Sequence, residues 1–296
     1  MFTVRSGRSG ERRDLDWQLR EGSAGVWLAS SPAGVWLRVR FSVLAKAAPE
    51  LVEHWAEFIV SPDGRHVSCQ LSHPQWASDA AELFIGPLFS AVLSRHHRLS
   101  LHANVVEFDG RCAGIIGPAG SGKSTMSLAL VNRGAHLVSD DLAALCETPG
   151  ALSVWPGLPR VRIHESAAAI AAAGFDTLQP LWSVKFPFED KRYLDLSGNT
   201  PDWGDRPLPL HALYLLADAE VDQPYVRRLH PAQALGHLMS NRHMPRLLDP
   251  DSDARDFFVI ARLVGEIPVA VLYRPRRLSS LDTAAAAVLA DVSSSA

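Results

Sequence analysis

The chain has 296 residues, of which 47% are hydrophobic and 21% are charged, and its formal net charge is −3. This composition is typical of a protein with a buried core, and the small net charge gives no reason to expect nucleic acid as a partner. No run of about 18 apolar residues occurs, so the sequence predicts no membrane-spanning helix and no membrane partner.

The cellular compartment is predicted from the amino-terminal residues and from the cysteines. The first residues, MFTVRSGRSGERRD, are charged and contain no apolar stretch of signal-peptide length. Cys69, Cys112 and Cys146 are far apart and form no Cys-x-x-Cys pair, so we expect three reduced thiols rather than disulfides. Both observations indicate a cytoplasmic protein.

Residues 1–97 are predicted to be a separate, strand-rich α+β region without a catalytic signature. Residues 26–29 and 35–44 read as two strands, and the turn residues Ser31-Pro32-Ala33-Gly34 between them predict a hairpin. Residues 75–98 carry apolar side chains at helical spacing, and Pro87 predicts a kink in that helix.

Residues 98–296 are predicted to form an α/β domain. Residues 99–108 alternate like a strand, Asp109-Gly110 is a hairpin turn, and residues 112–116 form a short buried strand. A glycine-rich loop, a helix over 123–132 and a strand over 136–139 complete a βαβ-type unit. The remaining predicted elements are helices at 165–173, 235–242, 253–264 and 282–292, and strands at 210–217 and 269–273.

The glycine-rich segment GPAGSGKS, residues 117–124, matches the phosphate-binding pattern G-x-x-x-x-G-K-[ST] in full. Glycines let the backbone curl so that successive N–H groups face phosphate oxygens, and the following helix adds a partial positive charge. Lys123 supplies a cation to the β- and γ-phosphates, and Ser124 a hydroxyl to Mg²⁺. We therefore expect ATP and Mg²⁺ as cofactors. The predicted nucleotide-binding residues are Gly117, Pro118, Ala119, Gly120, Ser121, Gly122, Lys123, Ser124 and Thr125.

Asp140 and Asp141 follow the predicted strand 136–139. A parallel neighbouring strand places both carboxylates at the same sheet edge as the loop. One carboxylate then holds Mg²⁺ and the other accepts a proton from an attacking hydroxyl, although a helix or turn cap explains one of them equally. His102, on the strand before the loop, is a candidate for contact with the γ-phosphate. A purely structural histidine is the alternative.

Three further groups of polar residues are candidates. Arg160 or Arg162 is suited to neutralise charge on a transferring phosphoryl group, and Glu165 to join the metal ligands. The alternative for all three is a solvated helix start. Lys191-Arg192 either clamps substrate or nucleotide, or is an exposed basic pair. Asn241-Arg242-His243, at the end of a helix, either has a functional role or carries cations there because of the helix dipole alone.

The segments HANVVEFDG, GPAGSGKST and NRGAHLVSDD resemble the HPr kinase/phosphorylase family, where a histidine, a hairpin, a P-loop, a helix and an aspartate pair recur in this order. The same block is similar to the ATP-dependent phosphoenolpyruvate carboxykinases, whose H-x-x-ANV motif is echoed by His102-Ala103-Asn104-Val105. The close match covers about residues 99–145. It implies an α/β fold with an HPr kinase/PEP carboxykinase-like P-loop core.

The resemblance also implies roles. Asp140 is expected to be the general base toward a seryl hydroxyl, Asp141 and Ser124 to hold the metal with Glu165, and His102 to orient Asp140 or the γ-phosphate. The glycine-rich second signature of the bifunctional enzymes is not visible, and residues 154–166 stand in its place. The chain is thus closer to HPr kinase-related proteins, some of which resemble kinases that phosphorylate a serine of a ribosomally made precursor peptide.

The sequence therefore predicts an ATP- and Mg²⁺-dependent kinase that phosphorylates a serine of a peptide or small protein, with Lys123, Asp140 and His102 as catalytic residues. The resemblance further implies a homo-oligomer. Two alternatives stay open: a P-loop kinase of small molecules, and a nucleotide-binding switch or ATPase without a phosphoacceptor.

Overall fold

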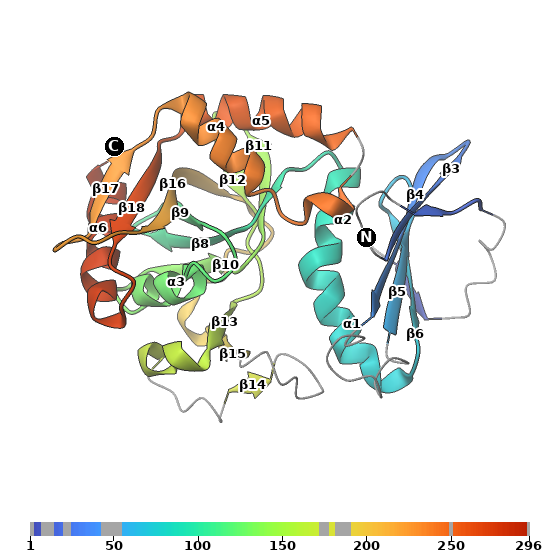
Figure 1. Ribbon diagram of the computed structural model, residues 1–296, viewed down its shortest axis with the longest axis horizontal. Coiled ribbons are helices and arrows are strands. Elements are labelled where there is room, and N and C mark those ends of the chain that lie inside the picture. The colour runs from blue at the N-terminus through green and yellow to red at the C-terminus, as the bar shows by residue number, and fades with distance from the viewer. Residues whose placement is uncertain are drawn as a thin grey trace. The chain divides into compact units, whose positions relative to one another are not determined.

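The computed structural model describes residues 3–6, 15–19, 25–42, 55–171, 178–180, 191–248 and 251–294. The chain forms two compact units, drawn in Figure 1, each of which is described by itself. Sequence analysis expects a boundary between residues 97 and 98. In the structure the chain passes from the first unit to the second between Arg98 and Leu99, and Met244–Ser252 also belongs to the first unit.

The first unit is built on a six-stranded sheet of order β1-β6-β5-β4-β3-β2. The predicted hairpin is confirmed, because β3 and β4 pair antiparallel with Ser31 opposite Gly34. Leu37, Val39 and Phe58 are buried between the sheet and the helices of this unit. The strands are β1 (Thr3–Ser6), β2 (Gln18–Leu19), β3 (Val26–Ser31), β4 (Gly34–Ser42), β5 (Trp55–Val60) and β6 (His66–Leu71).

The predicted long helix of the first unit is confirmed, and it is interrupted at Pro87 as expected. Helix α1 (Ala77–Leu83) passes into a π-helical turn, Phe84–Leu88, and continues as α2 (Phe89–Arg95). Proline has no N–H to donate to the preceding turn, so the hydrogen-bond ladder widens locally instead of ending.

The second unit has a mixed sheet of nine strands, which confirms the expected mixed α/β architecture. Its order is β10-β8-β9-β16-β12-β11-β7, with β18 beside β16 and β17 beside β18. The strands are β7 (Ser100–Leu101), β8 (Ala103–Phe108), β9 (Arg111–Ile116), β10 (His136–Ser139), β11 (Ala143–Thr148), β12 (Ala151–Val154), β16 (Leu208–Asp218), β17 (Tyr225–Arg228) and β18 (Val269–Arg274). A small second sheet contains β13 (Arg160–His164), β15 (Lys191–Asp195) and β14 (Gln179–Pro180).

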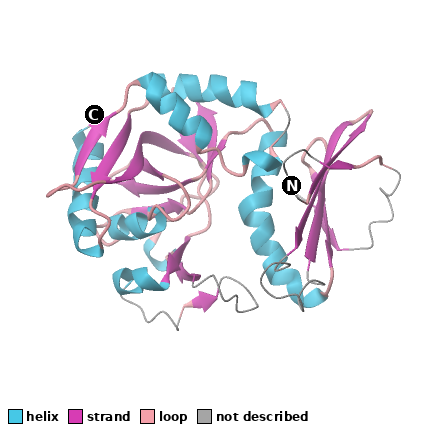
Figure 2. Cartoon of the chain, viewed as in Figure 1, coloured by secondary structure: helices cyan, strands magenta, loops and turns pink. Residues whose placement is uncertain are grey.

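Helices cover both faces of the large sheet, as Figures 1 and 2 show. Helices α3 (Lys123–Val131) and α6 (Leu281–Ser294) bury their apolar sides on one face. Helices α4 (Pro231–Ser240) and α5 (Ser252–Glu266) do so on the other. Each fully buried leucine or isoleucine contributes about 1.5–3 kcal/mol to this packing, so the sheet that carries the site is well supported.

The predicted strands and helices after residue 123 are largely confirmed, with one difference. Residues 165–173 were expected to form an α-helix, but Glu165–Ala171 is a 3₁₀ helix, and residues 172 and 173 lie outside the described part of the chain. The other short helical turns in the described residues are Pro74–Trp76, Ser197–Asn199, Pro245–Leu247 and Leu278–Ser280.

Two expectations about strand pairing are wrong. The predicted strand 99–108 is two strands, because His102 leaves the ladder and donates its backbone N–H to the carbonyl oxygen of Asn241 at 2.7 Å. Strand β10 is not a parallel neighbour of β9, since β8 lies between them and is antiparallel to both. Two strands antiparallel to the same strand run in one direction, so β9 and β10 still end at the same edge of the sheet.

Two further observations concern predictions from composition. All three cysteines are free, as expected, and burial raises the pKa of the Cys112 thiol to about 12. In the described part of the chain, no helix combines the length and the apolar character needed to cross a membrane.

Candidate active site

The glycine-rich loop joins the end of β9 to the start of α3. Gly120 and Gly122 have φ values of +78° and +92°, which residues with a side chain rarely adopt. A β-carbon at Gly117 would lie 2.5 Å from the Ser121 hydroxyl oxygen, so a larger residue there would displace the Ser121 side chain. The loop conformation therefore depends on its glycines.

Lys123 is the first residue of α3 and folds back over the loop. Its Nζ atom donates to the carbonyl oxygens of Gly117 at 2.9 Å and Pro118 at 3.3 Å, and the residue is only 7% exposed. Burial lowers the pKa of the lysine, while the nearby carboxylates of Asp141 and Asp140 act in the opposite direction. The loop thus holds a cation at its own centre.

Asp140 is an internal group. Its side chain is 6% exposed, and Oδ1 accepts hydrogen bonds from Asn104 Nδ2 at 2.6 Å and from the Ser124 hydroxyl at 3.1 Å. Its Oδ2 accepts from the backbone N–H of Arg162 at 2.9 Å. Burial raises the pKa of Asp140, although the charge of Arg162 opposes this shift. Asp140 therefore connects the strand end to the serine of the loop.

Asp141 faces the other way and lines the pocket. Its carboxylate accepts from Nε2 of His102 at 3.0 Å and contacts Nε2 of His243 at 3.4 Å, and it forms an ion pair with Arg162. Burial alone would raise its pKa, but the hydrogen bonds from both histidines and the Arg162 charge lower the pKa below the ordinary value. Asp141 is ionised and held from three sides.

Asn104 fixes the two aspartates relative to each other. It is fully buried on β8, and while its Nδ2 donates to Asp140, its Oδ1 accepts the backbone N–H of Asp141 at 3.0 Å. This bond supports the left-handed backbone of Asp141, whose φ is +71°. Sequence analysis named Asn104 only within a motif. Its position as a polar residue within the apolar run of residues 103–106 is the signal that identifies it.

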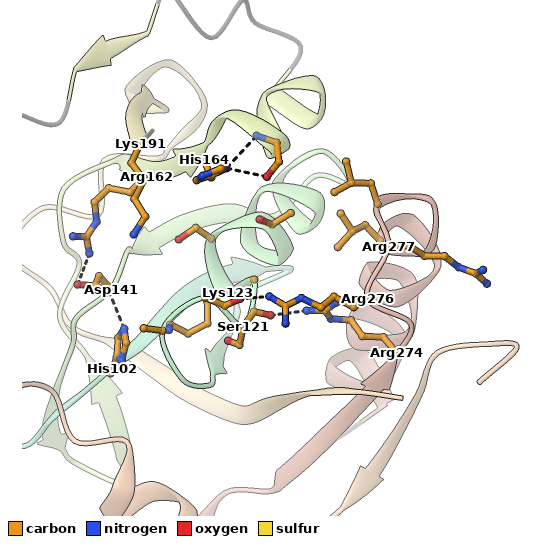
Figure 3. Close-up of a pocket in the computed structure, with 18 residues that line it drawn as sticks. His102, Ser121, Lys123, Asp141, Arg162, His164, Lys191, Arg274, Arg276 and Arg277 are labelled. Atoms are coloured by element: carbon orange, nitrogen blue, oxygen red, sulfur yellow. Dashed lines mark hydrogen bonds and ion pairs between the residues drawn. The ribbon is translucent and has the colours of Figure 1, made fainter. Parts of the chain in front are cut away.

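These side chains meet at a pocket of about 600 Å³, shown in Figure 3. Among the described residues, its lining contains six lysine or arginine side chains and two histidines but only one carboxylate, Asp141. A pocket with this charge is suited to a polyanion such as a triphosphate. The lining residues are His102, Ala119, Gly120, Ser121, Gly122, Lys123, Ser124, Thr125, Asp141, Arg162, His164, Ser166, Lys191, Arg274, Arg276, Arg277, Leu278 and Leu281.

Two arginines that sequence analysis missed hold the outer side of the loop. Arg274, at the end of β18, donates Nη2 to the carbonyl oxygen of Ser121 at 2.7 Å, and Arg276 donates Nη2 to that of Gly120 at 2.9 Å. Arg274 is 4% exposed, so this bond is an internal one. The run RPRR directly after the predicted strand 269–273 is the sequence signal for this pair.

The structure brings most of the predicted site residues together, but not all of them. His102, Lys123, Ser124 and Asp141 line one pocket, with Asp140 directly behind them. Glu165 is exposed and does not line this pocket, although its neighbours His164 and Ser166 do. The structure therefore gives no support to Glu165 as a metal ligand. Arg160, the alternative to Arg162, packs its guanidinium over the Tyr193 ring at 3.9 Å.

Fold and site together define an α/β protein in which a glycine-rich loop, an aspartate pair and a cationic pocket lie at one sheet edge. No protein-family model matches the sequence, and no curated protein matches it. Among solved structures the chain is similar to the Hpr(Ser) kinase/phosphatase from Coxiella burnetii. The TM-score is 0.37 and the identity 18%, over 65% of this chain and 89% of that chain. This similarity is distant and concerns the fold, and the kinase/phosphatase activity is that of the Coxiella burnetii protein alone.

The lowered pKa of Asp141 predicts how stability changes with pH. Because its folded-state pKa lies below the ordinary value of 3.8, its ionised form stabilises the fold at neutral pH, and this contribution decreases progressively as the pH falls from about 4 toward the lowered pKa. We expect Asp141→Asn to lower the free energy of unfolding at pH 7 and to differ less from the native protein at pH 2.5. Urea denaturation at both pH values measures this. A difference that does not change with pH contradicts it.

Proposed function

We propose that this protein transfers the γ-phosphoryl group of MgATP to a serine hydroxyl of a peptide or small protein. The observation that carries the proposal is the distance of 3.1 Å between the Ser124 hydroxyl of the loop and Oδ1 of Asp140, with Asp141 open to the same pocket as Lys123. A phosphate loop alone suits any nucleotide-binding protein. A second, pocket-facing carboxylate supplies a base for an acceptor hydroxyl.

The loop and its cations account for nucleotide binding in this proposal. The loop amides and Lys123 hold the β- and γ-phosphates, and Arg274 and Arg276 keep the loop carbonyls turned outward by donating to two of them. The charge of the pocket lining opposes that of the triphosphate. Lys123 exchanges its bonds to the carbonyl oxygens of Gly117 and Pro118 for bonds to phosphate oxygens when the nucleotide binds.

The oxygens of Ser124 and Asp140 fit a magnesium ion. Both are hard oxygen donors, they lie side by side, and Mg²⁺ in phosphoryl-transfer sites is held by one or two such groups together with substrate phosphates. When bound, the ion neutralises charge on the phosphoryl oxygens. Sequence analysis gave the metal to Asp141 and the base to Asp140. We propose the reverse, because Asp140 is enclosed by its hydrogen bonds while Asp141 faces the pocket.

Asp141 then acts as the general base once Arg162 has moved away from it, because the loss of that positive charge removes one cause of its lowered pKa. Its carboxylate accepts the proton of the serine hydroxyl while the serine oxygen bonds to the γ-phosphorus and the bond to the β–γ bridging oxygen breaks, which leaves ADP. His102 and His243 orient the carboxylate through their Nε2 atoms. Arg162 contacts both aspartates, so it is placed to move onto the transferring phosphoryl group and to free Asp141 as it does so.

Nucleotide binding and phosphoryl transfer are tested separately. Calorimetry with MgATP and MgAMP is expected to show binding of ATP only, because the site is built for phosphates. Incubation with γ-labelled ATP and a library of serine peptides is then expected to label serine. If MgATP does not bind, the whole proposal fails. If MgATP binds and is hydrolysed without labelling any peptide, the protein is a nucleotide-dependent switch or ATPase instead.

A further inference from the structure

The cations around the pocket form two groups on opposite sides of Lys123. Figure 3 shows Arg162, His164 and Lys191 on one side and the arginines that follow β18 on the other. The first group comes from the small sheet of β13 and β15, and the second from the end of β18 and the segment that leads to α6. One anionic group of a single ligand does not account for two separate groups of cationic side chains.

The second group belongs with the nucleotide. Arg274 and Arg276 are bonded to loop carbonyls, and Leu278 and Leu281 beside them are the large apolar residues of the lining. An apolar surface suits the nucleoside part of ATP, which is the only part without charge. The first group lies instead with Asp141, because Arg162 is ion-paired to that carboxylate.

The charges of the pocket exceed what MgATP neutralises. Among the residues that the structure describes, six lysine and arginine side chains line the pocket, and the carboxylates in contact with them or with the site are those of Asp140, Asp141 and Asp218. This leaves an excess of three positive charges before the histidines are counted. MgATP carries about two negative charges at neutral pH, so at least one positive charge is left for another ligand.

Lys191 and His164 are placed to bind that ligand. They are directly paired residues on the neighbouring strands β15 and β13, and both line the pocket. The backbone N–H of Ser166 donates to Nδ1 of His164 at 3.2 Å, so a neutral His164 carries its proton on Nε2. An ammonium group and an Nε2–H donor side by side are suited to bind a carboxylate.

We propose that Lys191 and His164 form a subsite for a carboxylate that the acceptor carries close to its serine hydroxyl. This inference rests on the proposed kinase function and narrows its substrate class to acidic peptides. The carboxylate comes either from a neighbouring Asp or Glu side chain or from the carboxyl terminus of the peptide.

The test uses the full-length protein, its Lys191→Met variant, and Arg206→Met as a matched loss of an exposed arginine outside the pocket lining. The probe is a library of peptides with one serine each, made with free and with amidated carboxyl termini. We expect the native protein to prefer peptides with a carboxylate near the serine by about tenfold or more in kcat/KM. Lys191→Met is expected to abolish this preference without changing the KM for ATP, and Arg206→Met to retain it.

The free-terminus and amidated forms distinguish the two sources of the carboxylate. The inference is overturned if the native protein shows no preference, if Lys191→Met keeps it, or if that variant instead raises the KM for ATP. A second measurement does not need transfer: binding of N-acetylserine and N-acetylserinamide to protein loaded with a non-hydrolysable MgATP analogue. If no peptide is labelled, the kinase proposal fails. Tighter binding of the acid form by native protein alone then still supports the subsite, and equal binding overturns it.

Discussion

Asp141→Asn is expected to lower the rate of phosphoryl transfer about a thousandfold, in the range by which a general base accelerates such a step. Asparagine retains the size of the side chain but has no free electron pair of sufficient basicity for the serine proton. The affinity of this variant for MgATP is expected to stay within about threefold of that of the native protein, because Asp141 does not contact Ser124. Single-turnover transfer of label from γ-labelled ATP measures the first quantity, and calorimetry the second.

Asp140→Asn is the variant to compare with Asp141→Asn, and it is expected to affect MgATP binding rather than the transfer step alone. Asp140 is the carboxylate bonded to the Ser124 hydroxyl at 3.1 Å, so its loss should weaken MgATP binding and raise the Mg²⁺ concentration needed for activity. The opposite result for the two variants would be equally informative. If Asp140→Asn binds MgATP normally but transfers nothing, while Asp141→Asn stays active, the roles implied by the family resemblance are the right ones.

Lys123→Met is expected to lower kcat/KM for ATP about a hundredfold or more, because a charge-assisted contact to the β- and γ-phosphates is lost. Methionine has a similar length and suits the buried position, so the fold is expected to persist. The rise in melting temperature on adding MgATP is expected to disappear in this variant. That measurement reports binding of nucleotide without requiring an acceptor.

Arg133→Met is the control for Lys123→Met. Arg133 pairs with Asp282 at 2.8 Å on the surface and lies outside the pocket lining, so its loss should leave the MgATP-induced rise unchanged. An unchanged rise in the Lys123→Met protein contradicts the assignment of the loop as the triphosphate site. Loss of the rise in both variants indicates instead that removing any cation has this effect.

The loop and its flanking elements were predictable because their causes are local. A glycine with φ near +80° or +90°, an apolar strand before it and a helix after it depend on residues within one short segment. Several helices and strands after residue 123 follow equally from the spacing of apolar residues, as α3, α5, β16 and β18 show, whereas β11, β12, β13 and β17 were not predicted. Expectations about the acceptor, the assembly and the compartment stay predictions.

The pairing of strands was less predictable. The spacing of apolar residues does not specify which strand inserts between two others, so the expected neighbours β9 and β10 are in fact separated by β8. The inserted strand has a consequence for the site. It places Asn104 beside Ser124 and the aspartate pair, where its side-chain amide bonds to both aspartates.

By itself the sequence determined the phosphate loop, Lys123, Ser124 and the presence of an aspartate pair, because a contiguous motif specifies these. Only the tertiary structure decided which aspartate turns inward, since the left-handed backbone of Asp141 sends two adjacent carboxylates in different directions. It also decided that Arg162 and Arg274 reach the site. Arg274 lies 153 residues along the chain from Ser121, whose carbonyl oxygen it binds, and local sequence patterns carry no information about contacts over such separations.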